Sequence, residues 1–432
     1  MTLTANWFKM RIDYRTTLFT VVLTLFFVKL AIVFFYQDEI EVWEDDVIAR
    51  NMVATGEMFY LQRGTPNYMF QFPVYPSLLY VTYRAFGLEP FNAIVLNLVI
   101  ISFTCFFLYK IFVDLGKMCN LEFTNVKPGF VALISVLAFQ VHPFITYYSM
   151  FKVHPFVFDM IFPIIMVFLS LRMLKNPSSG NLGLLALSTG FGMLNRATAV
   201  LALLPFLILG IRELGTKKTL VNISLVSLIS LFIVSPWLIR NYRLYNVFSM
   251  TMTGKEILWK GSLYNSDGSN YLLDGRTYKN ALSRKESTFL QEKPIAAQEE
   301  FFGEKYKKIL RKDPLHVIKM YLIKLRNFWL YHSNIGIEYS ERIQSFLIMY
   351  KVYVYFILVL NLGAVFLFRF RPLVLVSYPI GLSLIQSIFY VETRHRMIVE
   401  PFLLFFSVLA VLAVWDRSTH IDKRQTIPPI QR

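Results

Sequence analysis

Residues 16–36 read TTLFTVVLTLFFVKLAIVFFY, and Lys29 is the only charged side chain in this stretch. A helix needs about 20 mostly apolar residues to cross the hydrocarbon core of a bilayer, so the stretch is long enough to span one. It is too long for the apolar core of a signal peptide, and it has no small-residue cleavage site. The stretch therefore predicts a signal-anchor helix in an integral membrane protein.

The composition of the whole chain agrees with this prediction. Of its 432 residues, 55% are hydrophobic and 17% are charged, whereas soluble domains carry about 25% charged residues. The formal net charge is +16, but the Lys and Arg residues lie between long apolar runs. That pattern is typical of cytoplasmic loops in membrane proteins, and it argues against nucleic acid as a partner.

Further apolar runs predict an all-α polytopic membrane protein, with residues 1–432 forming a single integral membrane domain. The fifth and sixth runs are short, and we expect them to form a tight helix pair hinged at Asn195 and Arg196. The ten predicted transmembrane helices are about 16–36, 91–113, 128–148, 154–174, 182–195, 197–211, 219–238, 346–368, 372–390 and 397–415.

The distribution of Lys and Arg predicts the orientation. Basic residues gather before the first span, in alternate loops and in the C-terminal tail, which places both termini in the cytoplasm of a cell with the protein in its plasma membrane. The other face then carries two large extracytoplasmic loops, about 37–90 and 239–345. Amphipathic stretches in these loops, at 46–58 and 316–330, predict interfacial helices, and the short apolar segment 73–86 is interpreted as interfacial or re-entrant.

The cysteines and histidines predict neither a disulfide nor a metal centre. Cys105 lies in an apolar run, Cys119 lies in a short polar loop, and no two histidines have the i,i+4 spacing of metal ligands. No cofactor follows from this pattern.

Six carboxylates follow the first span within nine residues, with no basic residue before Arg50. Carboxylates packed this closely repel one another, so at least one pKa is expected to be raised, which suits a general base. Two other interpretations stay open: a solvated loop that is negative because it lies outside, and a divalent cation site. The six are Asp38, Glu39, Glu41, Glu44, Asp45 and Asp46.

Four motifs in order along the chain carry a family resemblance. They are Glu41 to Gly56 followed by Phe72-Pro73-Val-Tyr75-Pro76; Gly190 to Pro205; Pro236-Trp-Leu-Ile-Arg-Asn-Tyr242 followed by Leu258-Trp-Lys-Gly261; and Glu392-Thr-Arg-His-Arg396. Together they resemble the GT-C membrane glycosyltransferases, in particular the protein O-mannosyltransferase and lipid A aminoarabinose transferase group (glycosyltransferase family 39). The resemblance covers residues of about 30 to 415 and implies a GT-C type helical bundle.

The resemblance also implies an activity. The donor would be a sugar linked to polyprenyl phosphate in the membrane, and the acceptor hydroxyl of a lipid, glycan or protein would attack the anomeric carbon with inversion at the extracytoplasmic face. The family's catalytic Asp falls on Glu41, with Glu44 or Asp38 as alternatives, and its second acid best matches Asp159. A lysine that contacts the donor phosphate in some members is replaced here by Gln71.

Phosphate binding would then depend on other cations, because a guanidinium binds two phosphate oxygens at once. The donor phosphate candidates are Arg196, Arg240, Lys260, Arg394 and Arg396, and the candidates for lining the sugar or acceptor site are Trp259, Tyr242 and Asn195. Each has an alternative role: the arginines as interfacial anchors to lipid headgroups, the aromatic residues as an interfacial belt, and Asn195 as a helix cap.

Two other functions compete with the transferase. A transporter or flippase of an anionic glycolipid would place its polar site at the bilayer midplane, often between inverted repeats. This chain shows no repeat, and its charges gather at the outer ends of the spans, which favours the enzyme. A non-catalytic subunit of a glycan-assembly complex also stays open, because Glu41 stands where the family has Asp.

Overall fold

The computed structural model describes residues 13–118, 127–330, 344–367 and 372–425. These residues are mainly helical, with two small two-stranded sheets, and the predicted all-α membrane fold is confirmed. Cys119 lies outside the described residues, and Cys105 is buried with a free thiol.

The helices of the bundle coincide with the ten predicted apolar segments. They are α1 (Tyr14–Phe35), α4 (Pro90–Met118), α5 (Pro128–Gln140), α6 (Pro143–Phe151), α7 (Phe156–Lys175), α8 (Ser179–Asn195), η4 (Ala197–Leu203), α9 (Leu204–Glu213), α10 (Thr216–Tyr245), α16 (Gln344–Leu367), η6 (Pro372–Val376), α17 (Ser377–Gln386) and α19 (Glu400–Gln425). Among the described residues, α1, α4, α7 and α10 are long and apolar enough to cross a bilayer, and α5 with α6 forms a bent pair that also qualifies. The total of ten spans stays a prediction.

The bend between α5 and α6 has a local cause. Pro143 has no backbone N–H, so it can begin a helix but cannot continue one. The side chain of His142 caps the new helix by accepting a hydrogen bond from the backbone of Ile145 at 3.2 Å. The two helices meet at 54°, and α6 is thereby directed to the outer end of the bundle.

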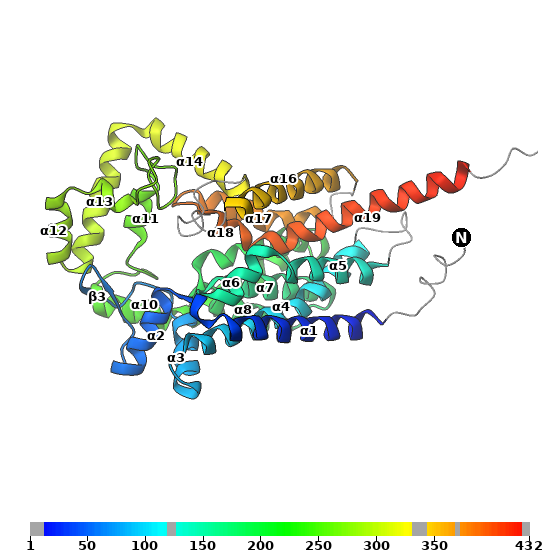
Figure 1. The fold of residues 1–432 in the computed structure, drawn as a ribbon, viewed down its shortest axis with the longest axis horizontal. Helices are drawn as coiled ribbons and strands as arrows, with labels where there is room; N and C mark the ends of the chain where they lie inside the picture. Colours follow the sequence, from blue (N-terminus) through cyan, green and yellow to red (C-terminus); the bar gives the residue numbers. More distant parts are fainter. Residues whose placement is uncertain (1–12, 119–126, 331–343, 368–371, 426–432) are drawn as a thin grey trace, which may run out of the picture.

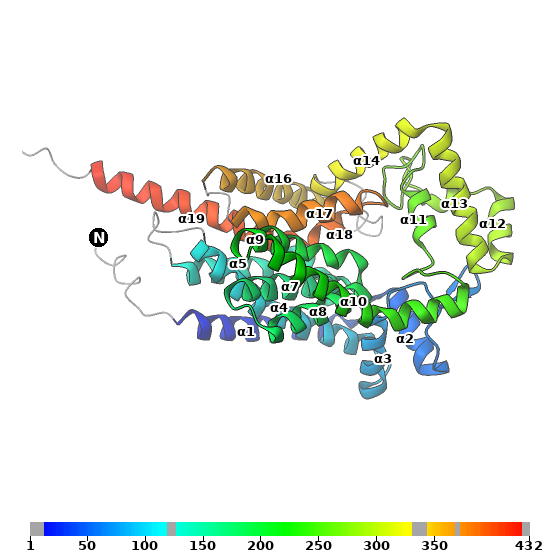
Figure 2. The same ribbon diagram turned by 180° about the vertical axis from the view of Figure 1, so that it is seen from behind.

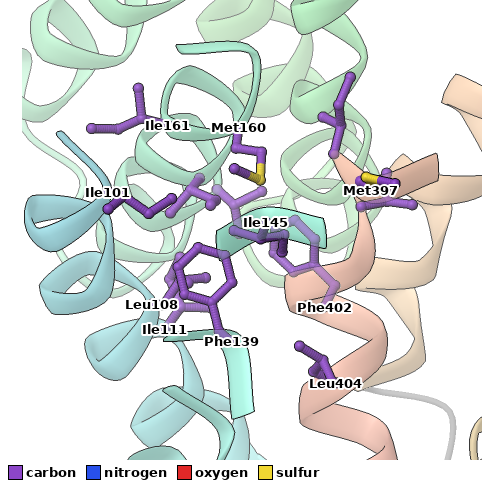
Figure 3. Close-up of a cluster of buried hydrophobic side chains, with 14 of the residues drawn as sticks. Ile101, Leu108, Ile111, Phe139, Ile145, Met160, Ile161, Met397, Phe402 and Leu404 are labelled. Atoms are coloured by element: carbon purple, nitrogen blue, oxygen red, sulfur yellow. The ribbon is translucent and has the colours of Figure 1, made fainter. Parts of the chain in front are cut away.

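The core of the bundle is apolar, and so is much of its outer surface. Ile101 and Leu108 of α4, Ile161 of α7 and Phe402 of α19 belong to one buried cluster (Figure 3). Large side chains such as Phe232 on α10 are exposed on the outside of the bundle. In water such a surface would be costly, but in a bilayer it faces hydrocarbon.

The remaining elements gather at the end of the molecule opposite the two chain termini (Figures 1 and 2). They are η2 (Gln37–Glu39), β1 (Glu41–Val42), α2 (Glu44–Thr55), β2 (Tyr60–Gln62), β3 (Thr65–Asn67), α3 (Val74–Phe86), β4 (Lys152–Val153), α11 (Gly254–Lys260), η5 (Tyr278–Ala281), α12 (Arg284–Glu292), α13 (Ile295–Lys312), α14 (Pro314–Trp329) and α18 (Thr393–Met397). Both predicted outer loops therefore lie at one end, which we call the outer end.

The two outer loops are joined by the β2–β3 hairpin. Its two-residue turn has positive φ at Arg63 (53°) and at Gly64 (85°), as a tight hairpin turn requires. The turn presents the Arg63 guanidinium to the carboxylate of Glu256 in α11. Glu256 is buried, so this ion pair fixes the first outer loop against the second.

The other sheet positions the candidate site. β1 follows α1, β4 follows α6, and the two strands pair in parallel with Glu41 opposite Lys152. The ends of two helices that are far apart in the sequence are thereby held side by side at the outer end.

Candidate active site

Glu41 and Lys152 form an ion pair across the β1–β4 sheet. The Tyr147 hydroxyl also donates a hydrogen bond to Oε1 of Glu41 at 3.4 Å. The side chain of Glu41 is 42% exposed, whereas that of Lys152 is 0% exposed. A buried ammonium thus holds a carboxylate that still reaches solvent.

Trp43 follows Glu41 by two residues, and polar side chains from other elements surround its indole ring. The Arg394 guanidinium of α18 lies over its ring at 5.1 Å from the centroid, and the Lys152 ammonium lies at 5.9 Å. The His154 imidazole meets it edge-on at 5.2 Å. Arg394, which the sequence placed near the donor phosphate, is thereby brought to the segment that carries Glu41.

A second set of contacts connects Arg394 to the second outer loop. Arg394 pairs with Glu392 at 2.8 Å, and Glu392 accepts a hydrogen bond from the Asn270 amide. The Asn270 oxygen in turn accepts a hydrogen bond from Lys260, whose ammonium lies 3.9 Å from the ring centroid of Tyr390. Lys260 and Arg394 are therefore linked through a continuous polar network.

Gly261 permits this approach. A Cβ added at Gly261 would overlap the carbonyl oxygen of Phe389. Only a residue without a side chain lets α11 come this close to the segment before α18. This explains physically why a glycine follows Trp259 and Lys260.

Asp159, Asn195 and Arg196 form a second cluster at the start of α7 and the end of α8. The Asp159 carboxylate accepts hydrogen bonds from Arg196 at 2.6 Å and from the Asn195 amide at 2.9 Å. Arg196 also donates to the side-chain oxygen of Gln386 at 3.3 Å. The sequence predicted all three as site residues, and in this structure they bind one another.

The histidines show that the cations of both clusters act on one region. Burial, followed by nearby positive charge, holds the pKa of His154 and that of His395 well below the ordinary value, so both rings are neutral. The cations that act on one or both rings are Lys152, Arg196, Lys260 and Arg394. Cations from both clusters are therefore close enough to act on these two histidines.

Residues 71–239 match the sequence model of the family described as dolichyl-phosphate-mannose-protein mannosyltransferase. The resemblance to the GT-C membrane glycosyltransferases is confirmed. The matched segment contains Asp159, Asn195 and Arg196, while Glu41, Lys260 and Arg394 lie outside it.

No curated protein matches the chain. Two crystal structures of ArnT from Cupriavidus metallidurans do match it, each over 97% of this chain and 81% of that chain. The structure bound to undecaprenyl phosphate has 16% sequence identity and a TM-score of 0.38, and the apo structure has 14% identity and a TM-score of 0.40.

The carboxylates of the acidic cluster, which precedes the matched segment, make different contacts. Asp46 pairs with Arg50 at 2.7 Å and accepts a hydrogen bond from the Tyr83 hydroxyl. Asp45 is buried, and burial, with the charges of Glu44 and Asp159, raises its pKa well above the ordinary value. The expected raised pKa is therefore found at Asp45. Among the residues that the structure describes, no group of three potential ligands is arranged to hold a metal ion.

Arg240 and Tyr242 lie at the base of the second outer loop. Nη1 of Arg240 donates to the carbonyl of Tyr68 at 3.1 Å, and its guanidinium lies 4.6 Å over the ring of Trp237. Tyr242 stacks on Phe248 with centroids 4.4 Å apart. Among the contacts of the described residues, none joins Arg240 or Tyr242 to Glu41, and Arg240 lies where the two outer loops meet.

Arg396 and Trp259 point into packed interiors. Arg396 is 1% exposed, lies 3.5 Å from Glu400 and donates to the carbonyl of Trp329 at 3.3 Å. Trp259 is also 1% exposed and packs on Phe302 in a small core of the outer loop, with centroids 5.0 Å apart. Trp259 and Arg396 thus make their contacts within the protein in this structure, and their roles in sugar and phosphate binding stay predictions.

Lys152 and Trp43 were missed by the sequence prediction. Lys152 lies in a short outer connection, where the charge rule for membrane loops predicts few cations. A lysine in an outer connection departs from this rule, and that departure was the sequence signal that could have identified Lys152. Their pairing with Glu41 and Arg394 depends on contacts between distant segments, which local spacing does not reveal.

Proposed function

We propose that this protein is an inverting glycosyltransferase that moves a sugar from a polyprenyl-phosphate donor to an acceptor hydroxyl. One observation supports this most directly: the partly exposed carboxylate of Glu41 lies beside cations from separate segments at the outer end of a membrane bundle. An acid that takes a proton and cations that receive a phosphate are the two requirements of the reaction.

Glu41 is the general base in this proposal. The acceptor oxygen forms a bond to the anomeric carbon on the face opposite the leaving phosphate, and the bond between that carbon and the phosphate oxygen breaks. The acceptor proton passes to Glu41, and polyprenyl phosphate leaves with the electron pair. Tyr147 and Lys152 orient the carboxylate while one of its edges stays accessible.

Arg394, Lys260 and Lys152 receive the leaving phosphate. The family description names a dolichyl-phosphate-linked sugar as the donor of its members, and a lipid phosphate is a dianion or monoanion that cations stabilise as the bond breaks. Arg394 suits this role because its guanidinium is already held over the ring of Trp43. Asp159 and Asn195 position Arg196 at the edge of the same region.

The membrane supplies the geometry of the reaction. The donor's lipid tail stays in the bilayer, and the outer end of the bundle carries the site. We propose that residues 1–432 act as one membrane domain, with both termini in the cytoplasm and the outer end extracytoplasmic.

The test is a transfer assay of the purified protein in lipid nanodiscs with a panel of polyprenyl-phosphate sugars and acceptors. Glu41→Gln should lower the turnover roughly 10²- to 10⁴-fold, the usual contribution of a general base. Glu39→Gln, two residues earlier in the same segment, is the matched control and should keep the wild-type rate. Full turnover by Glu41→Gln together with loss in Glu44→Gln would assign the base to Glu44 instead.

A further inference from the structure

A groove between α12 and α13 lies apart from the candidate active site. Its volume is about 920 Å³. The rings of Phe289 and Phe301 contribute its apolar part, with centroids 5.6 Å apart. The Lys293 ammonium lies 5.4 Å from the ring centroid of Phe289, and the Lys305 ammonium lies 5.3 Å from that of Phe301. Phe289 nevertheless stays 39% exposed, so part of its ring is left for a ligand.

The charges around this groove do not balance. The acids that line it, Glu300 and Glu304, are paired with Lys255 and Lys307, neither of which lines the groove. Lys305 is paired with Glu286 at 2.5 Å.

Three further cations line the groove. Lys308, Arg311 and Lys312 have no acidic partner among the residues that the structure describes. Their spacing of three and four residues places them along one side of α13. Cations in the last turn of a helix are also stabilised by the helix dipole, and this is a structural role for Arg311 and Lys312. That role does not explain why aromatic side chains lie beside them in the groove.

The position of the groove restricts its ligand. α12 and α13 lie at the outer end, beyond the bundle and opposite the chain termini (Figures 1 and 2). Large exposed apolar side chains that could face lipid lie on the bundle helices, such as Phe232 of α10, and on α14, such as Leu315, whereas the groove itself lies on α12 and α13. A ligand from the aqueous side is therefore favoured over a lipid headgroup.

We propose that the α12–α13 groove binds an anionic glycan and that this glycan serves as the acceptor. Its role as the acceptor rests on the proposed function, whereas its binding to the groove does not. The aromatic faces of Phe289 and Phe301 pack against the apolar faces of sugar rings. Lys308, Arg311 and Lys312 pair with the carboxylates or phosphates that such a chain carries. A neutral glycan would form no ion pairs with these cations. A polyanionic peptide without apolar groups would not pack against the aromatic rings.

Binding to soluble polygalacturonate fragments tests the proposal, with full-length protein in nanodiscs of neutral phosphatidylcholine and no donor present. Dextran serves as the neutral glycan and polyglutamate as the polyanion without sugar. Lys308→Ala/Arg311→Ala should weaken binding about tenfold, because two charge-assisted contacts are lost, and Phe289→Ala should weaken it by a similar factor. The control Lys279→Ala/Lys285→Ala removes the same charge from exposed sites outside the groove and should bind as the wild type does.

Three results would overturn the proposal: an equal loss in the control variant, dextran binding as tight as polygalacturonate, or polyglutamate binding as tight and unaffected by Phe289→Ala. The last result would instead point to an acidic protein partner. The Glu41→Gln protein should bind polygalacturonate normally, so a failed transfer assay and a failed binding assay are separate outcomes.

Discussion

The ammonium of Lys152 is completely buried, and it contacts the carboxylate of Glu41, which is 42% exposed. The two partners therefore depend on each other unequally. If Lys152 is removed, Glu41 regains hydration from solvent. If the charge of Glu41 is removed, a buried ammonium loses its counterion, which is costly.

Lys152→Met should consequently preserve the fold and impair the reaction. The methionine side chain fills a similar volume, and no charge is left buried. We expect transfer to fall roughly 10²-fold, the usual effect of losing one electrostatic stabiliser at a reacting centre, with a thermal unfolding midpoint close to that of the wild type. Unchanged transfer in Lys152→Met would remove Lys152 from the site.

The pair of the buried Asp159 and the partly exposed Arg196 should behave in the opposite way. Asp159→Ala leaves Arg196 without its main partner next to the buried amide of Asn195, and breaking such a pair costs about 3 kcal/mol. Asp159→Ala/Arg196→Ala should cost less than the sum of the single variants, because the second substitution removes the orphaned charge. Denaturant unfolding of the three variants measures this coupling, and strict additivity would show that the pair contributes nothing.

Much of the fold could be predicted because its signals are local. Runs of apolar residues long enough for a helix need no knowledge of distant segments, and each predicted span contains a helix. The break at Arg196 was likewise predictable, and α8 ends at Asn195 before η4 begins at Ala197. The motifs that indicate the GT-C resemblance are likewise local.

The candidate site was only partly predictable because side-chain direction depends on tertiary packing. Arg394 and Arg396 are two residues apart, yet one lies over Trp43 and the other packs against Glu400 in the interior. Lys152 escaped the prediction because its partner, Glu41, is reached only through the β1–β4 pairing.

Asp45 should make stability depend on pH. Its pKa in the folded protein is raised above the ordinary value of 3.8, mainly by burial. The folded state therefore holds this proton more tightly than the unfolded state, and the stabilising contribution is complete below pH 3.8 and is lost as the pH rises through the folded pKa. Asp45→Asn should be more stable than the wild type at neutral pH and lose less stability as the pH rises above 4. Parallel pH profiles of the unfolding midpoint would contradict this.

Gly261, the buried residue that ends α11, should be sensitive to substitution. A Cβ in Gly261→Ala overlaps the carbonyl oxygen of Phe389, so α11 must move away from the segment that leads to α18. Lys260 would then lose its place between Asn270 and the ring of Tyr390, and overpacking of this kind costs about 1–3 kcal/mol. Gly254→Ala is the matched control at the other end of α11, because a Cβ there meets nothing within 4 Å. We expect Gly261→Ala to lower the rate of transfer and to raise the KM for the donor, while Gly254→Ala changes neither. Equal kinetics in the two variants would show that the position of Lys260 does not matter to the reaction.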